Sequence, residues 1–312
     1  MSSRLDLNRC PNNDCSKKCT KEIRRVVAEN DLCSLTVSKI DRLAVRCVGE
    51  WAEQKIYLLS QYFGIFATGM KNKWSEINYI EICSGPGRCI RREVGEELDG
   101  TALTILKHKS FPILKNALFF DYDTTVVNVL NQRISKMNIM TAYAYVADYN
   151  QPDTICSVLR QRCSHDKSLN LILLDPTDCS VPFELLRQIK HTLKNVDILI
   201  NVATGTDFSR NIPQAFADPK RASKYNKFVG NNEFFIDKNN QALCRQQRYG
   251  ELRNAFREAY QRSLMSIGYS HFCTAKVEQY YTLLFAASNP KAAEFWRKAT
   301  KTEYDGQRQL LF

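Results

Sequence analysis

The 312-residue chain lacks any long uncharged apolar run, and its first residues, MSSRLDLNRC, contain no apolar segment. A membrane-spanning helix needs about 20 consecutive apolar residues, and a secretory signal needs an apolar core near the N-terminus. We therefore expect a cytoplasmic protein with no membrane segment. Only 9 prolines accompany 44% apolar and 11% aromatic residues, so the composition excludes global disorder and indicates a large folded core.

Several catalytic motifs are also absent. The chain contains no HExxH, no Gly-x-Ser-x-Gly and no Walker-type lysine loop. No motif therefore supports a metalloprotease, a serine hydrolase or a nucleotide triphosphatase. Its four histidines, at positions 108, 165, 191 and 271, are scattered, so no cysteine has an evident base for nucleophilic chemistry. We predict no metal among the candidate site residues named below.

Twelve cysteines are many for a cytoplasmic chain, but most stand singly in apolar segments, where a reduced thiol behaves as a small hydrophobic group. The exception is a polar N-terminal segment, residues 1–40, which carries Cys10, Cys15, Cys19 and Cys33. Four thiolates can close a tetrahedral zinc site, but the paired C-x2-C spacing is missing. Zinc ligands and free thiols both remain open readings of this segment.

Acidic residues are fewer than basic residues. The net charge is +11 and the isoelectric point is near 9.1, which favours nucleic acid or another polyanion as a partner. Residues 210–262 hold eleven Lys/Arg and five Asp/Glu, a net of +6, interleaved with aromatic residues. We expect a basic helical insert over 205–262 with two open readings: the aromatics stack on nucleic acid, or they form the core of the insert.

Apolar runs with the length of buried strands recur along the chain and show little alternation of polar and apolar residues. They are residues 77–83, 117–121, 142–146, 169–175 and 196–202. Such runs are typical of a parallel sheet covered on both faces. Segments with helical character precede and separate them, over 41–72, 87–98, 123–137, 151–163 and 182–194.

The repeated alternation of strand and helix predicts a doubly wound α/β sheet. After the basic insert, a helix over 250–269 is followed by two apolar stretches, 270–277 and 279–288, that predict an antiparallel hairpin. We therefore predict a Rossmann-like class I methyltransferase fold. Its sheet would have seven mostly parallel strands, with the hairpin at the end, in a domain spanning 41–312 with a C-terminal tail over 296–312.

Glycines follow the first predicted strand directly, in the stretch YIEICSGPGRC over 79–89. Gly85 and Gly87 would let backbone amides approach a ligand closely, at the start of a helix predicted to begin near Arg88. Glu81, in the strand, could accept a hydrogen bond from an amino group. Because Gly-x-Gly alone is a weak signal, the acids that end the later strands decide its interpretation.

An acid ends each of the next three predicted strands, at the sheet edge where α/β proteins bind ligands. Asp121, preferred over Asp123, is placed to accept hydrogen bonds from a ribose diol, and Asp148 from an adenine amine. Asp175 and Asp178 would face the reacting end of the ligand as candidate catalytic residues. Each acid alone could be a helix cap, but four strand ends in register favour a binding site.

The chain at this point resembles a known family. YIEICSGPGRC, DGTALTIL, FFDYD, ADYN, LLDPTD, VDILINV and the ending FWRKATKTEYDGQRQLLF, with VGEWAEQKIYLL, are similar to the three-Cys-motif partner family, over roughly 47–312. That resemblance implies a methyltransferase-like fold, S-adenosylmethionine as cofactor, a bacterial or phage setting and a neighbouring radical-type partner protein. It implies that Glu81, Gly85 and Gly87 lie on the methionine side of the cofactor site, Asp121 on the ribose and Asp148 on the adenine. Cys83 and Ser84, within the same turn, are further candidate cofactor-binding residues.

The chain departs from the broad methyltransferase pattern in three ways. Cys83 stands where glycine is usual, and more than the usual ~20 residues separate Gly87 from the ribose acid. An inserted loop over 99–116 would account for the extra length, lying over the site or displacing it. The sequence Asp175-Pro176-Thr177-Asp178 also lacks the second proline and the aromatic residue with which amino-methyltransferases hold a flipped base, which weakens an exocyclic amine as the target.

Three functions follow from these observations. The first is an S-adenosylmethionine-dependent methyltransferase acting on a nucleic acid or a nucleotide-like anion. The second is a non-catalytic partner of a radical-type enzyme, which keeps the fold and binds nucleic acid through residues 205–262. The third, a nicotinamide-dependent oxidoreductase, has the least support, because the third glycine of G-x-G-x-x-G is missing.

Overall fold

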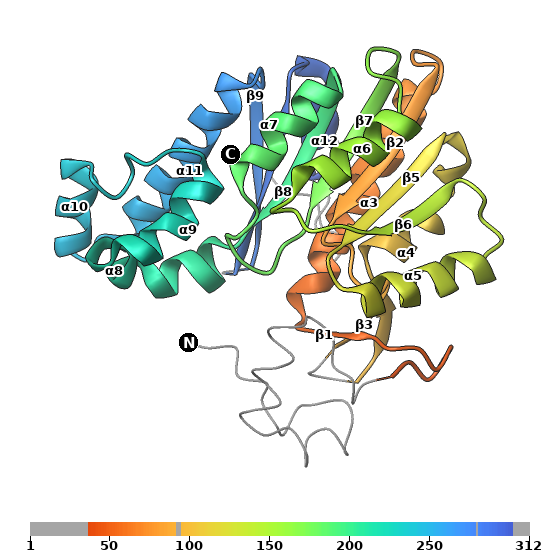
Figure 1. The fold of residues 1–312 in the computed structure, drawn as a ribbon, viewed down its shortest axis with the longest axis horizontal. Coiled ribbons are helices and arrows are strands. Elements are labelled where there is room, and N and C mark those ends of the chain that lie inside the picture. Colours follow the sequence, from red (N-terminus) through yellow and green to blue (C-terminus); the bar gives the residue numbers. More distant parts are fainter. Residues whose placement is uncertain (1–36, 92–94, 279, 302–312) are drawn as a thin grey trace. The chain divides into compact units, whose positions relative to one another are not determined.

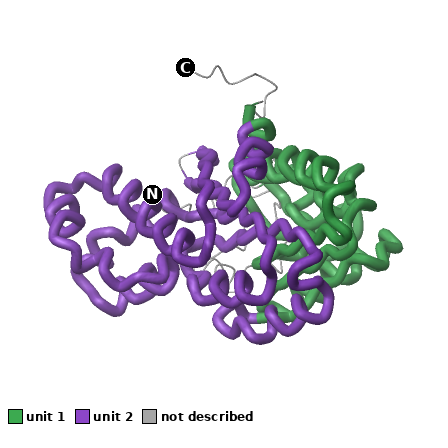
Figure 2. The backbone as a smooth tube through the Cα atoms, turned by 90° about the horizontal axis from the view of Figure 1, so that it is seen from above, with its two compact units in different colours: residues 1–147, 298–312 green, residues 148–297 purple. Residues whose placement is uncertain are grey.

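The computed structural model describes residues 37–91, 95–278 and 280–301. The chain divides into two compact units, residues 1–147 with 298–312 and residues 148–297 (Figure 2). The four N-terminal cysteines of the zinc hypothesis lie outside the described residues. The eight cysteines in the described part of the chain are not joined in disulfides, and no helix there has the length and apolarity to cross a membrane.

Seven strands form one sheet in the order β6-β5-β2-β7-β8-β10-β9 (Figure 1). The pairs β2–β5, β5–β6 and β7–β8 are parallel, whereas β10 is antiparallel to both β8 and β9. The strands are β2 (Glu76–Ile82), β5 (Asn116–Asp121), β6 (Ala142–Val146), β7 (Ser168–Leu174), β8 (Asn195–Val202), β9 (His271–Val277) and β10 (Tyr281–Ala287). The predicted fold class, a Rossmann-like methyltransferase sheet ending in an antiparallel hairpin, is confirmed.

The first unit packs three helices with β2, β5 and β6. They are α3 (Trp51–Met70), α4 (Thr101–Leu106) and α5 (Thr124–Lys136), with a short 3-10 turn, η2 (Phe111–Ile113). Strand β5 is buried along its whole length, as expected for a strand covered on both faces. The rings of Phe63 and Phe119 each lie 6.0 Å from that of Tyr79, so aromatic residues of α3, β2 and β5 form one core.

A small second sheet replaces a predicted helix. Residues 87–98 were expected to be helical from Arg88 onward, which is wrong: β3 (Arg88–Arg91) and β4 (Glu97–Asp99) pair antiparallel, and β1 (Arg46–Val48) pairs parallel with β3. Burial alternates along β3 with the period of a strand. Nonlocal pairing with β1 supplies the backbone partners, and no local sequence pattern reveals such a partner.

The same sheet corrects the two neighbouring predictions. The helix expected over 41–72 begins only at Trp51, because residues 46–48 belong to β1. The extra length before Asp121 is not a loop over 99–116, since α4 lies there; it is the β3–β4 hairpin. The N–H of Gly100 donates to the carbonyl of Gly87 at 2.8 Å, so the chain leaves the glycine turn and returns to it before α4 begins.

The second unit contains the remaining helices. They are α6 (Pro152–Arg162), α7 (Phe183–Thr192), a π-helical turn η3 (Thr204–Phe208), α8 (Ser209–Ala217), α9 (Pro219–Val229), α10 (Lys238–Arg245), α11 (Tyr249–Ser266) and α12 (Pro290–Ala299). Helices α8 to α11 gather beside one another, as Figure 1 shows in teal and blue. Phe285 of β10 stacks on Trp296 of α12 with ring centroids 5.3 Å apart, which joins sheet and helix in the core.

The aromatic residues of the insert are core residues, so the second of the two readings of 205–262 is correct. Phe228, Phe256 and Tyr260 are almost fully buried, and the rings of Phe208 and Phe256 stack at 3.9 Å. Most of the lysines and arginines of this segment are exposed. Any anion that binds the insert therefore meets charge rather than these buried stacking surfaces.

Candidate functional site

The glycine turn follows β2 in a left-handed backbone conformation. Cys83, Gly85 and Gly87 have φ values of 65°, 63° and 89°. Left-handed backbone costs about 1–2 kcal/mol for a residue with a β-carbon and little for glycine. The departure at Cys83, where methyltransferase patterns have glycine, thus falls on a position whose backbone would favour glycine.

The two glycines have different surroundings. A β-carbon on Gly87 would lie 2.8 Å from a methyl carbon of Leu130 and 3.2 Å from Leu103, so packing against α4 and α5 excludes a side chain there. Among the described residues, the nearest atom to a β-carbon on Gly85 would be Nη1 of Arg46, at 3.6 Å. Only Gly85 therefore leaves its backbone open to a close approach by a ligand.

Asp121, at the end of β5, lies against this turn. One carboxylate oxygen accepts from the N–H of Gly85 at 3.0 Å, and the other accepts from the N–H of Asp123 at 3.2 Å. Burial raises the pKa of Asp121, while these two N–H groups and the charge of Arg46 oppose the rise. Because a carboxylate has about four acceptor positions, Asp121 retains capacity for two further donors, such as a ribose diol.

Asp123 has a separate task. Its side chain accepts from the backbone N–H groups of Thr125 and Val126 and caps the N-terminus of α5. We considered a helix cap as the alternative role for each strand-end acid, and Asp123 has that role. The preference for Asp121 as the ribose acid stays a prediction.

Glu81 and Ser84 complete the predicted residues on this side. Glu81 is fully buried and accepts hydrogen bonds from the hydroxyl of Tyr79, at 2.8 Å, and from that of Thr101 on α4. The N–H of Ser84 donates to the carbonyl of Phe120, but its buried hydroxyl has no hydrogen-bond partner within the part of the chain that the structure describes. These contacts fix Glu81 to the start of α4, a link that sequence reasoning did not foresee.

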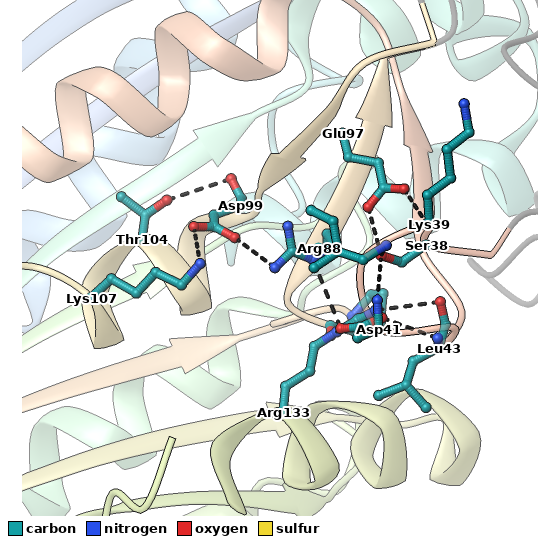
Figure 3. Close-up of polar contacts among 12 residues, drawn as sticks. Ser38, Lys39, Asp41, Leu43, Arg88, Glu97, Asp99, Thr104, Lys107 and Arg133 are labelled. Carbon is teal, nitrogen blue, oxygen red and sulfur yellow. Dashed lines mark hydrogen bonds and ion pairs between the residues drawn. The ribbon is translucent and has the colours of Figure 1, made fainter. Parts of the chain in front are cut away.

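Arg133 on α5 binds both the glycine turn and Asp41, and its contact with Asp41 is drawn in Figure 3. Its guanidinium donates to the carbonyl of Pro86 at 2.6 Å and to both carboxylate oxygens of Asp41, at 2.7 and 3.0 Å. Arg88 forms ion pairs with Asp41 at 3.8 Å and with Asp99 at 3.3 Å. The turn is thereby tied through Arg133 to residues 38–43, which the sequence did not single out.

The protonation of Asp41 sets a testable pH dependence. Burial acts to raise its pKa, but hydrogen bonds from Arg133 and from the N–H of Leu43, with the charge of Arg133, outweigh it and lower the pKa from 3.8 to about 2. A lowered pKa stabilises the fold above the unfolded value and loses that contribution as pH falls through the folded value. We expect the free energy of unfolding to decline between pH 3.8 and about 2, measured by urea denaturation.

An Asp41→Asn variant provides the comparison for that measurement. Asparagine cannot titrate, so the variant should be less stable at neutral pH and lack this part of the acid-induced decline. Equal pH slopes for the two proteins in this range would show that other carboxylates cause the decline.

The strand-end acids of the second unit have local partners. Asp148 accepts from the backbone N–H and the side-chain amide of Asn150, at 2.8 and 2.9 Å, in a short Asx turn. Asp175 is buried and accepts from the Asn201 amide at 3.0 Å, and that amide also donates to the carbonyl of Pro176. These two donated bonds orient the amide, and the buried Oδ1 of Asn201 has no partner among residues 37–91, 95–278 and 280–301.

Asp178 takes part in a different cluster. Lys224, on α9 of the basic insert, lies 2.8 Å from carboxylate oxygens of both Asp178 and Asp207. Asp207 also accepts from the Cys179 N–H at 2.9 Å and from the Tyr225 hydroxyl at 3.0 Å. Asp178 thus holds the insert to the loop after β7, and its carboxylate is paired with Lys224.

Metal ligands do not gather in the described part of the chain. No group of three or more His, Cys, Asp or Glu side chains within residues 37–91, 95–278 and 280–301 could hold a metal ion. Of the eight described cysteines, Cys156, Cys163 and Cys179 are buried, and burial raises the pKa of Cys156 and Cys179, so these two are poor thiolates.

Comparisons with known proteins show no family for this chain. No family model and no curated protein matches the sequence, so the three-Cys-motif partner family gains no support. Among solved structures, a Legionella pneumophila protein of the DUF519 family model is 9% identical with a TM-score of 0.47, covering 82% of this chain and 94% of its own.

Two methyltransferase structures show similar distant likenesses. Human methyltransferase-like protein 13, in complex with SAH, is 10% identical with a TM-score of 0.41, covering 81% of this chain and 92% of its own. A SAM-dependent methyltransferase from Aquifex aeolicus is 10% identical with a TM-score of 0.36, covering 76% of this chain and 98% of its own. At these values the likenesses carry no information about the ligand or substrate of this chain.

Proposed function

We propose that the protein is an S-adenosylmethionine-dependent methyltransferase that acts on a nucleic acid or a nucleotide-like anion. The observation that carries this proposal is the contact between Gly85 and Asp121, which joins an open glycine turn to a buried acid at neighbouring strand ends. Strand ends of this kind bind nucleotides in open α/β sheets. The class I methyltransferase order of the seven strands agrees with this ligand.

The residues present fit such a cofactor. Asp121 has acceptor capacity for a ribose diol, the backbone at Gly85 is open, and the buried Ser84 hydroxyl has no hydrogen-bond partner among the described residues. Glu81 and Cys83 lie at the end of β2, and Asp148 follows β6 in the sequence. When bound, S-adenosylmethionine supplies an electrophilic methyl group.

The chain's own contribution to transfer would be positioning and proton acceptance. Asp175 is buried and is oriented by a hydrogen bond from the Asn201 amide, and we take it as the candidate to accept a proton from an attacking nitrogen or hydroxyl. Asp178 is neutralised by Lys224, which favours a structural task for it. The net charge of +11 favours an anionic substrate, and residues 210–262 carry +6 of that charge.

Calorimetry with S-adenosylmethionine tests the proposal. We expect wild-type protein to bind and the Asp121→Asn variant to bind about 10- to 100-fold more weakly, because charge-assisted hydrogen bonds to the ribose hydroxyls contribute about 1.5–3 kcal/mol. The matched control is Asp123→Asn, since asparagine caps a helix as well as aspartate does. Absence of wild-type binding at millimolar ligand would refute the proposal, and equal losses in both variants would remove Asp121 from the site.

A second candidate function is a non-catalytic, nucleic-acid-binding partner of a radical-type enzyme. The ion pair between Asp178 and Lys224 favours it, because it removes one predicted catalytic acid and fixes the basic insert in place. The two candidates differ in one measurement: transfer of a labelled methyl group from S-adenosylmethionine to RNA or DNA. Binding that weakens steeply with salt, without transfer, would favour the second.

A further inference from the structure

A segment outside the seven-stranded sheet lies against the glycine turn. This N-terminal arm, residues 37–48, is closed by a bridge between Val37 and Ala44 and continues into β1, which pairs with β3. The β3–β4 hairpin and the arm thus form one small sheet. The arm precedes the glycine turn in the sequence, and the hairpin follows it directly. The sequence pattern missed both, because it predicted helices over 41–72 and 87–98 where these strands lie.

The arm brings a cation to the turn. Arg46, the first residue of β1, is half-buried, and its Nη1 lies 3.6 Å from the position of a β-carbon on Gly85. Its charge also acts on Asp121, where it opposes the burial that raises the pKa of that carboxyl. Arg46 is therefore close to the two groups that define the candidate cofactor site.

Buried contacts hold the arm in this place. Asp41 receives two hydrogen bonds from Arg133, whose side chain is 3% exposed, and Ser38 donates to Glu97 of β4 at 2.6 Å (Figure 3). Because Arg133 also holds the carbonyl of Pro86, the arm and the glycine turn share one anchor. Their relative position is thus fixed before any ligand arrives, which favours binding by preorganisation.

The chemistry of the cofactor matches this placement. Its adenosine part carries no negative charge, so the carboxylate of its amino-acid end is its one anionic group. A guanidinium presents five donors in a planar fork that fits a carboxylate, and it can serve Asp121 and a ligand together. With a neutral side chain at position 46, the negative charges of the ligand carboxylate and of Asp121 would repel each other without the positive charge of Arg46 to offset the repulsion.

We propose that Arg46 binds the carboxylate at the amino-acid end of S-adenosylmethionine, so that the N-terminal arm completes the cofactor site. This inference rests on the proposed function. It assigns a ligand contact to a strand outside the methyltransferase sheet. Arg133 and Asp41 act as positioning residues, because they hold the arm and the turn without a direct role toward the ligand.

Two related ligands separate this role from a structural one. S-adenosylhomocysteine has the amino-acid end, and 5′-methylthioadenosine lacks it while keeping the adenosine. In calorimetry, Arg46→Gln should weaken S-adenosylhomocysteine binding about 10- to 100-fold, by loss of a charge-assisted bidentate contact, and change methylthioadenosine binding less than about twofold. Arg46→Lys should recover part of the loss, because it restores the charge without the fork.

The matched control is Arg42→Gln, an exposed arginine on the same arm that should leave both affinities unchanged. Equal weakening of both ligands by Arg46→Gln would show that Arg46 only supports the fold, and unchanged binding of both would exclude it from the site. Failure of the wild-type protein to bind S-adenosylhomocysteine would instead refute the proposed function, so the two failures are distinguishable.

Discussion

We expect replacement of Arg133 by glutamine to lower the free energy of unfolding by about 3–5 kcal/mol, the range found when one partner of a buried ion pair is removed. Arg133 has a side chain that is 3% exposed, and the Asp41 carboxylate that it neutralises is 13% exposed. The variant leaves that carboxylate with Arg88 at 3.8 Å as its remaining guanidinium partner among the contacts described here. It also removes the donor that holds the Pro86 carbonyl.

Urea denaturation of the wild-type protein and the variant measures this loss. The matched control is Arg187→Gln, which breaks an exposed i,i+3 pair with Glu184 and should cost about 0–1 kcal/mol. A loss at Arg133 no larger than that at Arg187 would show that water reaches the Asp41 carboxylate and replaces the arginine. The clamp on the glycine turn would then be a weak surface contact.

The parts of the fold that the sequence predicted are those with local signals. Strands such as β5 and β7 are continuous apolar runs, and burial on both faces of a parallel sheet explains why they lack alternation. The β3–β4 hairpin was missed because β3 pairs with β1, about forty residues earlier, and strand pairing over that sequence separation has no local signature. The helix expected over 41–72 failed at its start for the same reason.

The candidate site shows the same division. Gly85 and Asp121 could be found from sequence because both follow apolar strands, and their hydrogen bond joins them as the strand-end argument requires. Arg46 and Arg133 could not, because each reaches the turn through tertiary contacts of its own element. Lys224 likewise neutralises Asp178 from 46 residues away, a distance over which charge spacing carries no information.

The two glycines of the turn are expected to respond differently to alanine, which separates folding from binding. Cys83 shows that a residue with a β-carbon is accommodated here at a φ of 65°, so the left-handed backbone does not by itself exclude a side chain. At Gly87 an added methyl overlaps Leu130, and we expect Gly87→Ala to cost about 2–5 kcal/mol, from backbone strain of about 1–2 and overpacking of about 1–3.

Gly85→Ala should cost only the backbone term, about 1–2 kcal/mol, because its methyl would meet no heavy atom closer than 3.6 Å. That methyl, however, would occupy the space between the turn and Arg46, where we propose that the ligand contacts the Gly85 backbone. Affinity for S-adenosylhomocysteine should therefore fall more than about tenfold. Urea denaturation of both variants measures the loss of stability, and calorimetry measures the loss of affinity for S-adenosylhomocysteine. A folded Gly85→Ala protein with wild-type affinity would place the ligand elsewhere and leave the open backbone at Gly85 as a feature of the turn alone.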